Sequence, residues 1–246
     1  IRMRPWVELS APDTVRLPVH YNHAVQGLIY HLLPADYRQM LHDSGYVDGK
    51  RALKLFTFSR IFGRVLKVDA GVIVLQPPLR LCISSLVEQF LSELVNQLIK
   101  RIRVRLFGNE LRLTSIEFPR RPTLGGKVEF YTLSPITVYS TLHTADGRRK
   151  TYYYSPYERE FSELVSTNLS RKYRAYKGEE AKGDVTITPV GRPKERIVLF
   201  KDTVIKAWSG GFAMEGDERL IEIAYDAGIG SKNSAGFGMV EVSHHV

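Results

Sequence analysis

Residues 228–238 carry the sequence Gly-Ile-Gly-Ser-Lys-Asn-Ser-Ala-Gly-Phe-Gly, in which two glycine–apolar–glycine triplets enclose five small or polar residues. Glycine weakens the interior of a helix or strand, so four glycines in eleven positions indicate a backbone that turns sharply or lets another group approach closely. The enclosed residues supply backbone amides, two hydroxyls, one amide side chain and one lysine. Such a segment is suited to contact phosphate groups.

The composition bounds the class of protein. The chain has 246 residues, which is enough for one large or two ordinary domains. Its 43% hydrophobic and 25% charged residues are typical of a globular protein. A single cysteine, Cys82, excludes an internal disulfide framework and a cysteine-based zinc site. The apolar runs are too short to cross a bilayer and no signal-peptide pattern opens the chain, so we expect a cytoplasmic location and no membrane partner.

The chain is strongly basic. It carries 35 Lys and Arg against 26 Asp and Glu, a formal net charge of +9 and a pI near 9.6. A positive balance of this size favours a polyanionic partner. The alternative is a solvated basic surface, which composition alone does not exclude.

The first half of the chain shows two amphipathic helices among short strands. The apolar residues Val25, Leu28, Ile29, Leu32 and Leu33 recur at helical spacing, and a second helical piece follows Pro34. A capping box formed by Ser85 and Glu88 predicts the start of another helix. Strands are predicted over residues 4–9, 53–58, 65–68, 72–75, 101–106 and 111–113.

The second half repeats this order. Residues 122–127 read as a linker between an N-terminal domain over 1–121 and a C-terminal domain over 128–246. A hairpin turns at Asp146-Gly147, a helix begins near Ser155 and ends at Gly178, and another helix spans 217–226. Further strands are predicted over 185–190, 197–200, 203–214 and 239–242. Each half therefore approximates strand, helix, strand, strand, helix, strand. This predicts an α+β fold of two tandem ferredoxin-like (RRM-like) domains, with antiparallel sheets and helices on one face.

Three residues of the first half combine acid–base and cationic groups. Tyr30 lies at the edge of a helix's apolar stripe, His42 follows the second helical piece, and Lys54 begins a strand. Together such groups can cut a phosphodiester without a metal: one assists the 2′-hydroxyl, one protonates the leaving 5′-oxygen, and a cation stabilises the phosphate. Histidine suits the acid role, while tyrosine is a reluctant base that can still orient the hydroxyl.

Each of these residues also has a purely structural interpretation. Tyr30 fits an amphipathic boundary position, His42 a surface histidine and Lys54 a strand-edge lysine. Spacing alone favours these structural roles, because such triples are common in basic proteins. We expect no metal site and no cofactor, since no cluster of carboxylates is present and the His20–His23 pair is typical of structural histidines.

Basic residues gather in several places. Arg101, Arg103 and Arg105 alternate along a predicted strand and would share one of its faces, and Arg148 and Arg149 lie at a hairpin. They form a candidate electrostatic path for RNA or DNA. A solvated sheet face is the structural alternative for the first group.

Several segments together resemble a known family. They are residues 21–23 (Tyr-Asn-His) with 26–30 (Gln-Gly-Leu-Ile-Tyr), 54–59 (Lys-Leu-Phe-Thr-Phe-Ser), 133–136 (Leu-Ser-Pro-Ile) and 228–240. The glycine-rich segment resembles the loop of the repeat-associated mysterious proteins, the RNA-binding superfamily of CRISPR systems. More narrowly, nearly the whole chain resembles the Cas6 family of endoribonucleases, which cut CRISPR precursor RNA within its repeats. Members of that family have two tandem ferredoxin-like domains.

The resemblance implies a metal-independent endoribonuclease that leaves a 2′,3′-cyclic phosphate and a 5′-hydroxyl. It places a Tyr-His-Lys triad at Tyr30, His42 and Lys54, with His31 as the alternative histidine. It also implies contacts between the glycine-rich loop and RNA, with Lys232 and Asn233 as the best candidates and a purely architectural role as the alternative. The loop residues expected to contact RNA are Gly228, Gly230, Ser231, Lys232, Asn233, Ser234, Gly236 and Gly238.

The implied partners are CRISPR repeat RNA, a CRISPR effector complex and a second copy of the chain, since some relatives dimerise. A second function stays open at this point: a non-catalytic RNA-binding subunit of a CRISPR effector complex. A double-RRM-like protein of general RNA metabolism is the more distant alternative.

Overall fold

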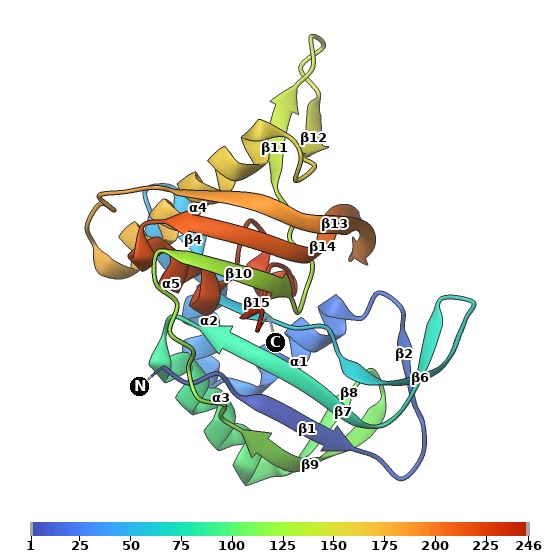
Figure 1. The fold of residues 1–246 in the computed structure, drawn as a ribbon. Helices are drawn as coiled ribbons and strands as arrows, with labels where there is room; N and C mark the ends of the chain where they lie inside the picture. The colour runs from blue at the N-terminus through green and yellow to red at the C-terminus, as the bar shows by residue number, and fades with distance from the viewer. Residues whose placement is uncertain (1, 245–246) are drawn as a thin grey trace.

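The computed structural model describes residues 2–244. Within them lie two large antiparallel sheets, each with its helices packed on one face, and two smaller two-stranded sheets (Figure 1). The predicted α+β, ferredoxin-like architecture is confirmed. Residues 118–126 join the two sheets and form neither helix nor strand. The division into domains over 1–121 and 128–246 stays a prediction. No helix within residues 2–244 is both long and apolar enough to cross a membrane.

The first sheet is built by the N-terminal half. Its central order β9-β1-β7-β5 is that of the strands of a ferredoxin-like unit, with all neighbours antiparallel. The elements of this unit are β1 (Trp6–Ser10), α1 (Asn22–Leu32), β5 (Phe56–Phe58), β7 (Val72–Ser85), α3 (Glu88–Arg101) and β9 (Asn109–Glu117). Additional elements are β2 (Val15–Pro18), α2 (Ala35–Asp43), β3 (Tyr46–Asp48), β4 (Arg51–Leu53), β6 (Phe62–Asp69) and β8 (Arg103–Leu106).

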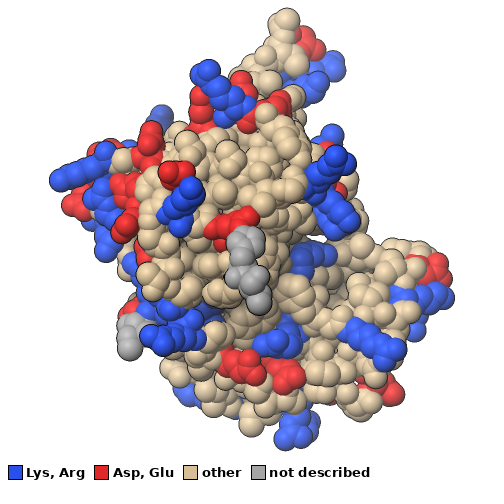
Figure 2. All heavy atoms as spheres, in the orientation of Figure 1, with Lys and Arg blue, Asp and Glu red and all other residues tan. Residues whose placement is uncertain are grey.

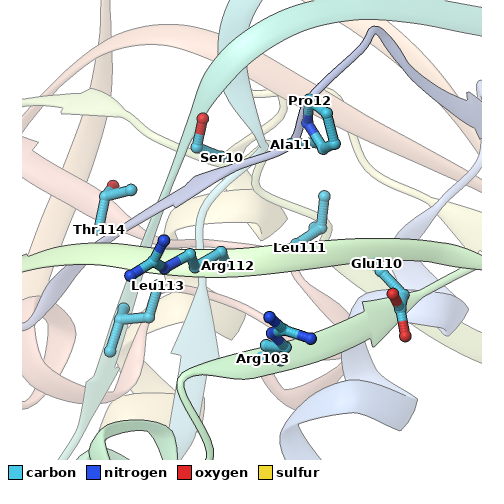
Figure 3. Close-up of a pocket in the computed structure, with 9 residues that line it drawn as sticks. All are labelled: Ser10, Ala11, Pro12, Arg103, Glu110, Leu111, Arg112, Leu113 and Thr114. Carbon is cyan, nitrogen blue, oxygen red and sulfur yellow. The ribbon is translucent and has the colours of Figure 1, made fainter.

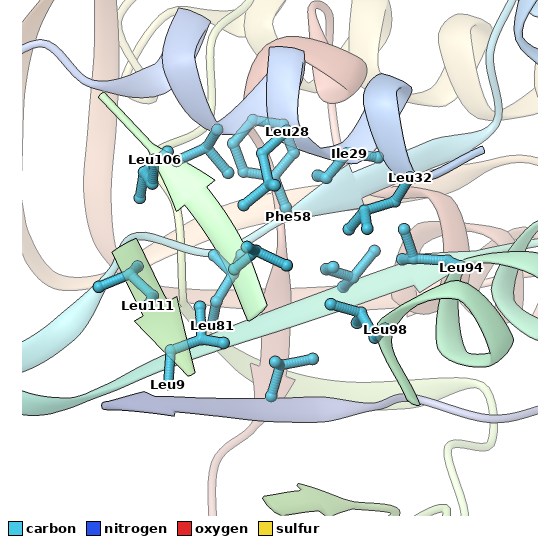
Figure 4. Packing of buried hydrophobic residues seen from close by; sticks show 14 of the residues in the cluster. Leu9, Leu28, Ile29, Leu32, Phe58, Leu81, Leu94, Leu98, Leu106 and Leu111 are labelled. Carbon is cyan, nitrogen blue, oxygen red and sulfur yellow. The ribbon is translucent and has the colours of Figure 1, made fainter. Parts of the chain in front are cut away.

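The core of this half lies between the sheet and the helices α1 and α3. Leu28 and Leu32 of α1 point toward Leu94 and Leu98 of α3 and toward the strands beneath them (Figure 4). Leu94 is fully buried, as the helical spacing of α3 predicts. Burial of this apolar surface holds α1 in place, and with it Tyr30 near the helix end.

The second sheet is built by the C-terminal half and has the order β13-β14-β10-β15. Its elements are β10 (Lys127–Thr132), α4 (Arg159–Lys177), β13 (Val185–Phe200), β14 (Thr203–Gly216), α5 (Glu218–Ala227) and β15 (Val240–Val242). A hairpin of β11 (Tyr139–His143) and β12 (Arg149–Tyr153) projects from the body (Figure 1). The short 3₁₀ helix Asn233–Ala235 lies within the glycine-rich loop. The predicted glycine cap of α4 is confirmed, since Gly178 adopts a left-handed φ of 75°.

The two halves are joined by buried polar contacts. The guanidinium of Arg4, ahead of β1, donates to the carbonyls of Val240 (2.7 Å) and Tyr225 (2.6 Å) and to the carboxylate of Glu241 (2.8 Å). Arg174 of α4 holds Asp48 of β3 with two hydrogen bonds of 2.5 and 2.6 Å. Bidentate arginine–carboxylate pairs fix the orientation of the groups that they join. These contacts therefore help to fix the orientation of the C-terminal half relative to the N-terminal half.

The predicted capping box at Ser85 and Glu88 is wrong. Helix α3 begins at Glu88, but its N-cap residue is Val87, whose side chain forms no capping hydrogen bond. Ser85 is the last residue of β7, where its hydroxyl donates to the carbonyl of Leu55 over 2.9 Å. Ser85 pairs with Phe56 of β5 in the sheet, so it belongs to β7 and not, as the local sequence pattern predicts, to the start of the helix.

Two strand predictions also change. The strand expected over residues 53–58 is divided into β4 and β5, because Leu55 between them has a φ of 59°. Arg101 is the last residue of α3 and Ile102 follows with a φ of 60°, so Arg101 does not share a strand face with Arg103 and Arg105. The backbone turn at Ile102 is the physical reason, because a left-handed residue breaks the alternation of a strand.

Candidate functional site

Lys54 lies between β4 and β5, beside the C-terminal end of α2. Its ammonium donates to the carbonyl of His42 over 3.2 Å and also to the carbonyl of Leu41. Carbonyls at a helix C-terminus lack helical partners, and a cation there is stabilising. Partial burial lowers the pKa of Lys54, and the nearby Asp43 carboxylate opposes this effect. The lysine is therefore fixed by its own chain rather than free on the surface.

His42 occupies the last turn of α2 and its side chain is 82% exposed. Nδ1 of the imidazole lies 2.9 Å from the Asp43 carboxylate. That hydrogen bond holds the pKa of the Asp43 carboxyl below its usual range. The ring is thus accessible to a ligand from solvent, and a carboxylate orients one of its nitrogens.

Tyr30 lies at the end of α1 and is half-buried. Its ring meets the edge of the Phe56 ring with centroids 6.0 Å apart. Burial raises the pKa of the Tyr30 phenol above its ordinary value. The phenol therefore stays protonated at neutral pH and is suited to orient a hydroxyl rather than to act as a base.

The structure brings these candidates into one region without joining their side chains. Lys54 contacts the backbone of His42, and Tyr30 contacts Phe56, two residues beyond Lys54. Between residues 2 and 244, no hydrogen bond links the phenol, the imidazole and the ammonium to one another. His31 is exposed on α1, so solvent access alone does not separate it from His42. The choice between the two histidines stays a prediction.

The glycine-rich loop has the sharp backbone that its sequence predicts. Gly230 has a φ of 74°, and a Cβ on it would lie 2.5 Å from the carbonyl oxygen of Thr137. Gly238 has a φ of 79°, and a Cβ there would collide with the carbonyl of Ile229. Both positions therefore require glycine, for conformation and for space.

The loop is bound to the N-terminal half by side chains of α1 and β5. Asn22 donates to the carbonyl of Ala235 over 2.9 Å, and Gln26 donates to that of Ser234 over 2.8 Å. The hydroxyl of Thr57 donates to the carbonyl of Phe237 over 2.9 Å. Because the backbone of this loop is used in internal contacts, its buried glycines support the fold.

Asn233 differs from the expectation that it faces solvent and contacts RNA. It is only 9% exposed, and its amide donates to the carbonyls of Ile229 (3.1 Å) and Phe237 (3.0 Å). An amide that already satisfies two buried carbonyls is not available for a ligand. Ser231, Lys232 and Ser234 are the loop side chains that remain partly exposed.

A buried lysine of α4 holds the base of the loop. Lys172 is 3% exposed, and its amine donates to the carbonyls of Gly228 (2.8 Å) and Gly230 (3.1 Å). Burial lowers the pKa of Lys172 to about 7. The sequence analysis predicts the helix that ends at Gly178 but does not single out Lys172. The one available signal was a lysine between the apolar positions Leu169 and Tyr173 of the helix.

A cavity of about 300 Å³ lies between the two halves, beside the loop. Lys54 and Arg51 line it from the N-terminal half, and Ser231, Lys232 and Ser234 line it from the loop. The ammonium of Lys232 lies 5.2 Å from the centre of the Tyr139 ring. Lysine, arginine and hydroxyl groups thus converge on one cavity, which is the chemistry that binds a phosphate. The loop and Lys54 lie far apart in the sequence but face each other across this cavity.

The other basic candidates lie elsewhere on the surface. Arg103 and Arg112 stand opposite each other in the ladder of β8 and β9 and line a hollow of about 670 Å³ (Figure 3). Arg105 is exposed 3.6 Å from Glu110, and Arg148 and Arg149 are exposed on the β11–β12 hairpin. On the face shown in Figure 2, basic side chains are spread over both halves and alternate with acidic ones.

Residues 2–244 contain no group of three or more His, Cys, Asp or Glu side chains arranged to hold a metal ion. His20 and His23 contact the far end of the second sheet instead. Nδ1 of His20 accepts from the amide of Leu199 over 3.1 Å, and the His23 ring meets the edge of the Phe200 ring with centroids 5.4 Å apart. Both histidines therefore join the two halves.

Comparison with known proteins decides the family. The family model described as "CRISPR associated protein Cas6, C-terminal" matches residues 119–242, the segment that contains the whole second sheet and the glycine-rich loop. The chain belongs to the Cas6 family. This match confirms the resemblance found in the sequence.

Similar Cas6 proteins cover almost the whole chain. The CRISPR-associated endoribonuclease Cas6 of Pyrococcus furiosus is 29% identical over 98% of this chain and 90% of its own length. The CRISPR-associated endoribonuclease Cas6 1 of Methanocaldococcus jannaschii is 29% identical over 97% of this chain and 92% of its own length. A solved structure described as CRISPR associated protein Cas6 superposes with a TM-score of 0.82 at 25% identity, covering 99% of this chain and 100% of its own.

Proposed function

We propose that this chain is an endoribonuclease that cleaves CRISPR precursor RNA within its repeats. The observation that carries the proposal is the basic cavity between the two halves, where Lys54 faces Ser231, Lys232 and Ser234 of the loop. Family membership supports the reaction class, because two relatives that match nearly the whole chain are named as CRISPR-associated endoribonucleases.

The proposed reaction is attack by a ribose 2′-hydroxyl on the adjacent phosphorus. A new bond forms between the 2′-oxygen and phosphorus, and the bond to the 5′-oxygen breaks. The products are a 2′,3′-cyclic phosphate and a 5′-hydroxyl. In this reaction the nucleophile is part of the substrate, so the protein has to supply orientation, charge stabilisation and a proton for the leaving group. A metal ion is not required for any of these roles.

The three candidate residues take separate roles in this proposal. Tyr30 orients the 2′-hydroxyl, because burial keeps its phenol protonated, and the hydroxyl's own proton passes to water. His42 protonates the departing 5′-oxygen, a role to which its 82% exposed side chain has access. Lys54, held at the end of α2, stabilises the negative charge that grows on the phosphate.

Binding of the RNA on both sides of the cavity is assigned to Lys232, which lines the cavity, and to basic side chains outside it. Lys232 extends from the loop, and Arg103, Arg105, Arg148 and Arg149 are exposed on the strands β8 and β12 or beside them. Contacts of this kind neutralise phosphates and hold the RNA in register without reading its bases.

A cleavage assay on repeat RNA in the presence of EDTA tests the proposal. We expect cutting at one position, with a cyclic phosphate on the upstream product. Periodate treatment and end-labelling of the products identify the termini. Loss of cutting in EDTA with recovery on addition of Mg²⁺ would contradict the metal-independent reaction, while the endoribonuclease assignment would stand.

A second candidate function is a non-catalytic RNA-binding subunit of a CRISPR effector complex. It is favoured by the contacts of the triad in this structure, since His42 is bonded to Asp43 and Lys54 to backbone carbonyls. Tight binding of repeat RNA without cleavage, with and without Mg²⁺, would select this function.

A further inference from the structure

A second cavity of about 460 Å³ adjoins the one that contains Lys54. It lies between α4, the strand β11 and the loop, and it shares Arg51, Tyr139, Asn168 and Ser231 with the first cavity. Arg171 of α4 lines only the second cavity. The two cavities are therefore neighbouring spaces, one beside Lys54 and one beneath the projecting hairpin.

Asn168 has polar groups that the protein leaves without partners. Its Oδ1 is excluded from solvent and accepts no hydrogen bond, and none of the described residues bonds to its Nδ2. An unpaired buried carbonyl costs about 1–3 kcal/mol. Because nothing holds the amide, rotation about its terminal bond can turn either polar atom toward the cavity. The side chain is thus able to pair with the edge of a planar ligand.

Two arginines beside Asn168 form no direct ion pair among residues 2–244, although the Asp48 carboxylate attracts both of them at longer range. Arg174 takes up both carboxylate oxygens of Asp48, the acidic residue nearest to them. No ion pair of Arg51 or Arg171 is found within residues 2–244. Burial, and next the positive charge of Arg51, lowers the pKa of Arg171. The Asp48 carboxylate is already bound by Arg174 and offsets only part of this positive charge, so the two arginines create a site that favours an anion.

Tyr139 adds a flat apolar surface to the same cavity. Its ring is half-buried, and the ammonium of Lys232 lies 5.2 Å from the ring centre. Aromatic rings next to basic side chains are the surfaces on which unstacked RNA bases lie.

From this combination we infer that the second cavity is a subsite for one nucleotide of the RNA. Its base lies against Tyr139 and pairs with the amide of Asn168, and its phosphate lies between Arg51 and Arg171. This inference rests on the proposed function and deepens it, since it assigns a base-contacting residue next to the cleavage site. The subsite is a specificity-determining element of the C-terminal half that the triad does not supply.

A double-mutant cycle between the protein and the RNA tests the inference. Affinity is measured for repeat RNA and for versions in which one base at a time is replaced by an abasic ribose. For the wild type, we expect the abasic replacement to lower the affinity roughly tenfold at one position of the RNA. A loss of this size corresponds to one hydrogen bond made to a buried group. For Asn168→Leu, we expect the abasic replacement at that position to leave the affinity unchanged, because the side chain that pairs with the base has been removed.

Matched controls separate this effect from general weakening. Asn96→Leu changes an exposed asparagine on α3, in the other half, and should keep the full loss at the sensitive position. Arg51→Gln and Arg171→Gln should each reduce the slope of log affinity against log salt by about one. Asn168→Ala serves as the second variant, and unfolding temperatures establish that the variants are folded.

The outcomes are distinct. If Asn168→Leu shows the same abasic profile as the wild type while RNA is still bound and cut, the subsite is absent and the proposed function stands. If the wild type neither binds nor cuts repeat RNA, both proposals are removed. Binding of free AMP, CMP, GMP or UMP that depends on Asn168, without coupling to any RNA position, would identify a free-nucleotide site and overturn the RNA subsite.

Discussion

The amine of Lys172 lies 2.8 Å from the carbonyl oxygen of Gly228, inside the protein, and forms no ion pair with a carboxylate of residues 2–244. The lysine therefore holds the glycine-rich loop through neutral carbonyls, at a place where its own charge is poorly solvated. Burial lowers the pKa of Lys172 to about 7 for this reason.

The buried lysine predicts a rise of stability with pH. Unfolded lysine titrates near 10.4 and folded Lys172 near 7, so the unfolded chain binds more protons between these two values. Stability should therefore increase as pH rises above 7, with a slope of up to about 1.4 kcal/mol per pH unit. Urea unfolding of the wild type and of Lys172→Met is measured between pH 7 and 9. The difference between their free energies of unfolding gives the pH-dependent contribution of Lys172. Lys177→Met, an exposed change on the same helix, should leave the slope as it is.

Removal of His42 predicts a defect in cleavage without a defect in binding. A general acid contributes about 10² to 10⁴ in rate, so His42→Ala should slow single-turnover cleavage by that factor. RNA affinity should change little, because the imidazole is not a fixed cation. His31→Ala, also exposed, is the matched control. A large loss of rate in His31→Ala with a normal rate in His42→Ala would move the acid to His31.

The two central residues of the loop predict opposite phenotypes. Lys232→Ala should weaken RNA binding and lower its salt dependence by about one phosphate contact, with stability retained. Asn233→Ala removes the side-chain donor from the carbonyl of Ile229 and leaves that of Phe237 with Thr57 alone, so it should lower the free energy of unfolding by about 1–3 kcal/mol. Salt-dependent binding and urea unfolding of both variants distinguish the two roles. Equal stability of Asn233→Ala and the wild type would contradict the internal role of Asn233.

A pair of glycine substitutions predicts opposite changes in stability. Gly238→Ala introduces a Cβ against the carbonyl of Ile229 at a φ of 79°, and it should destabilise the protein by about 2–5 kcal/mol. Gly27→Ala lies on α1 with no atom within 4 Å of the new Cβ, and it should stabilise the protein by roughly 0.5–1 kcal/mol. Thermal unfolding measures both changes. A neutral effect of Gly238→Ala would mean that the loop can relax away from Ile229.

The sequence predicted those features that short segments determine. The helical spacing of Val25 to Leu33 and the left-handed cap at Gly178 depend on neighbours in the chain, and the structure has both. The glycine-rich segment also has the sharp backbone expected from its composition. The sequence was sufficient to predict these features, because each depends on residues that are only a few positions apart in the chain.

Other features depend on partners that are distant in the chain. Ser85 matches a helix cap, yet its hydroxyl donates to the carbonyl of Leu55, the residue just before β5. Asn233 is a polar residue of a polar loop, yet packing against α1 and β5 turns its amide inward. The cavity that Lys54 shares with Lys232 joins residues from both halves. No pattern along the sequence indicates such a meeting, because it is set by how the two sheets pack together.

The contacts of Arg4 have a consequence for synthesis of the chain. Its guanidinium is bound by Tyr225, Val240 and Glu241, which are synthesised more than 200 residues after Arg4. Until the ribosome has released these residues, the arginine cannot form these hydrogen bonds. We therefore expect a nascent chain that lacks residues 225–241 to be more sensitive to protease than one that contains them.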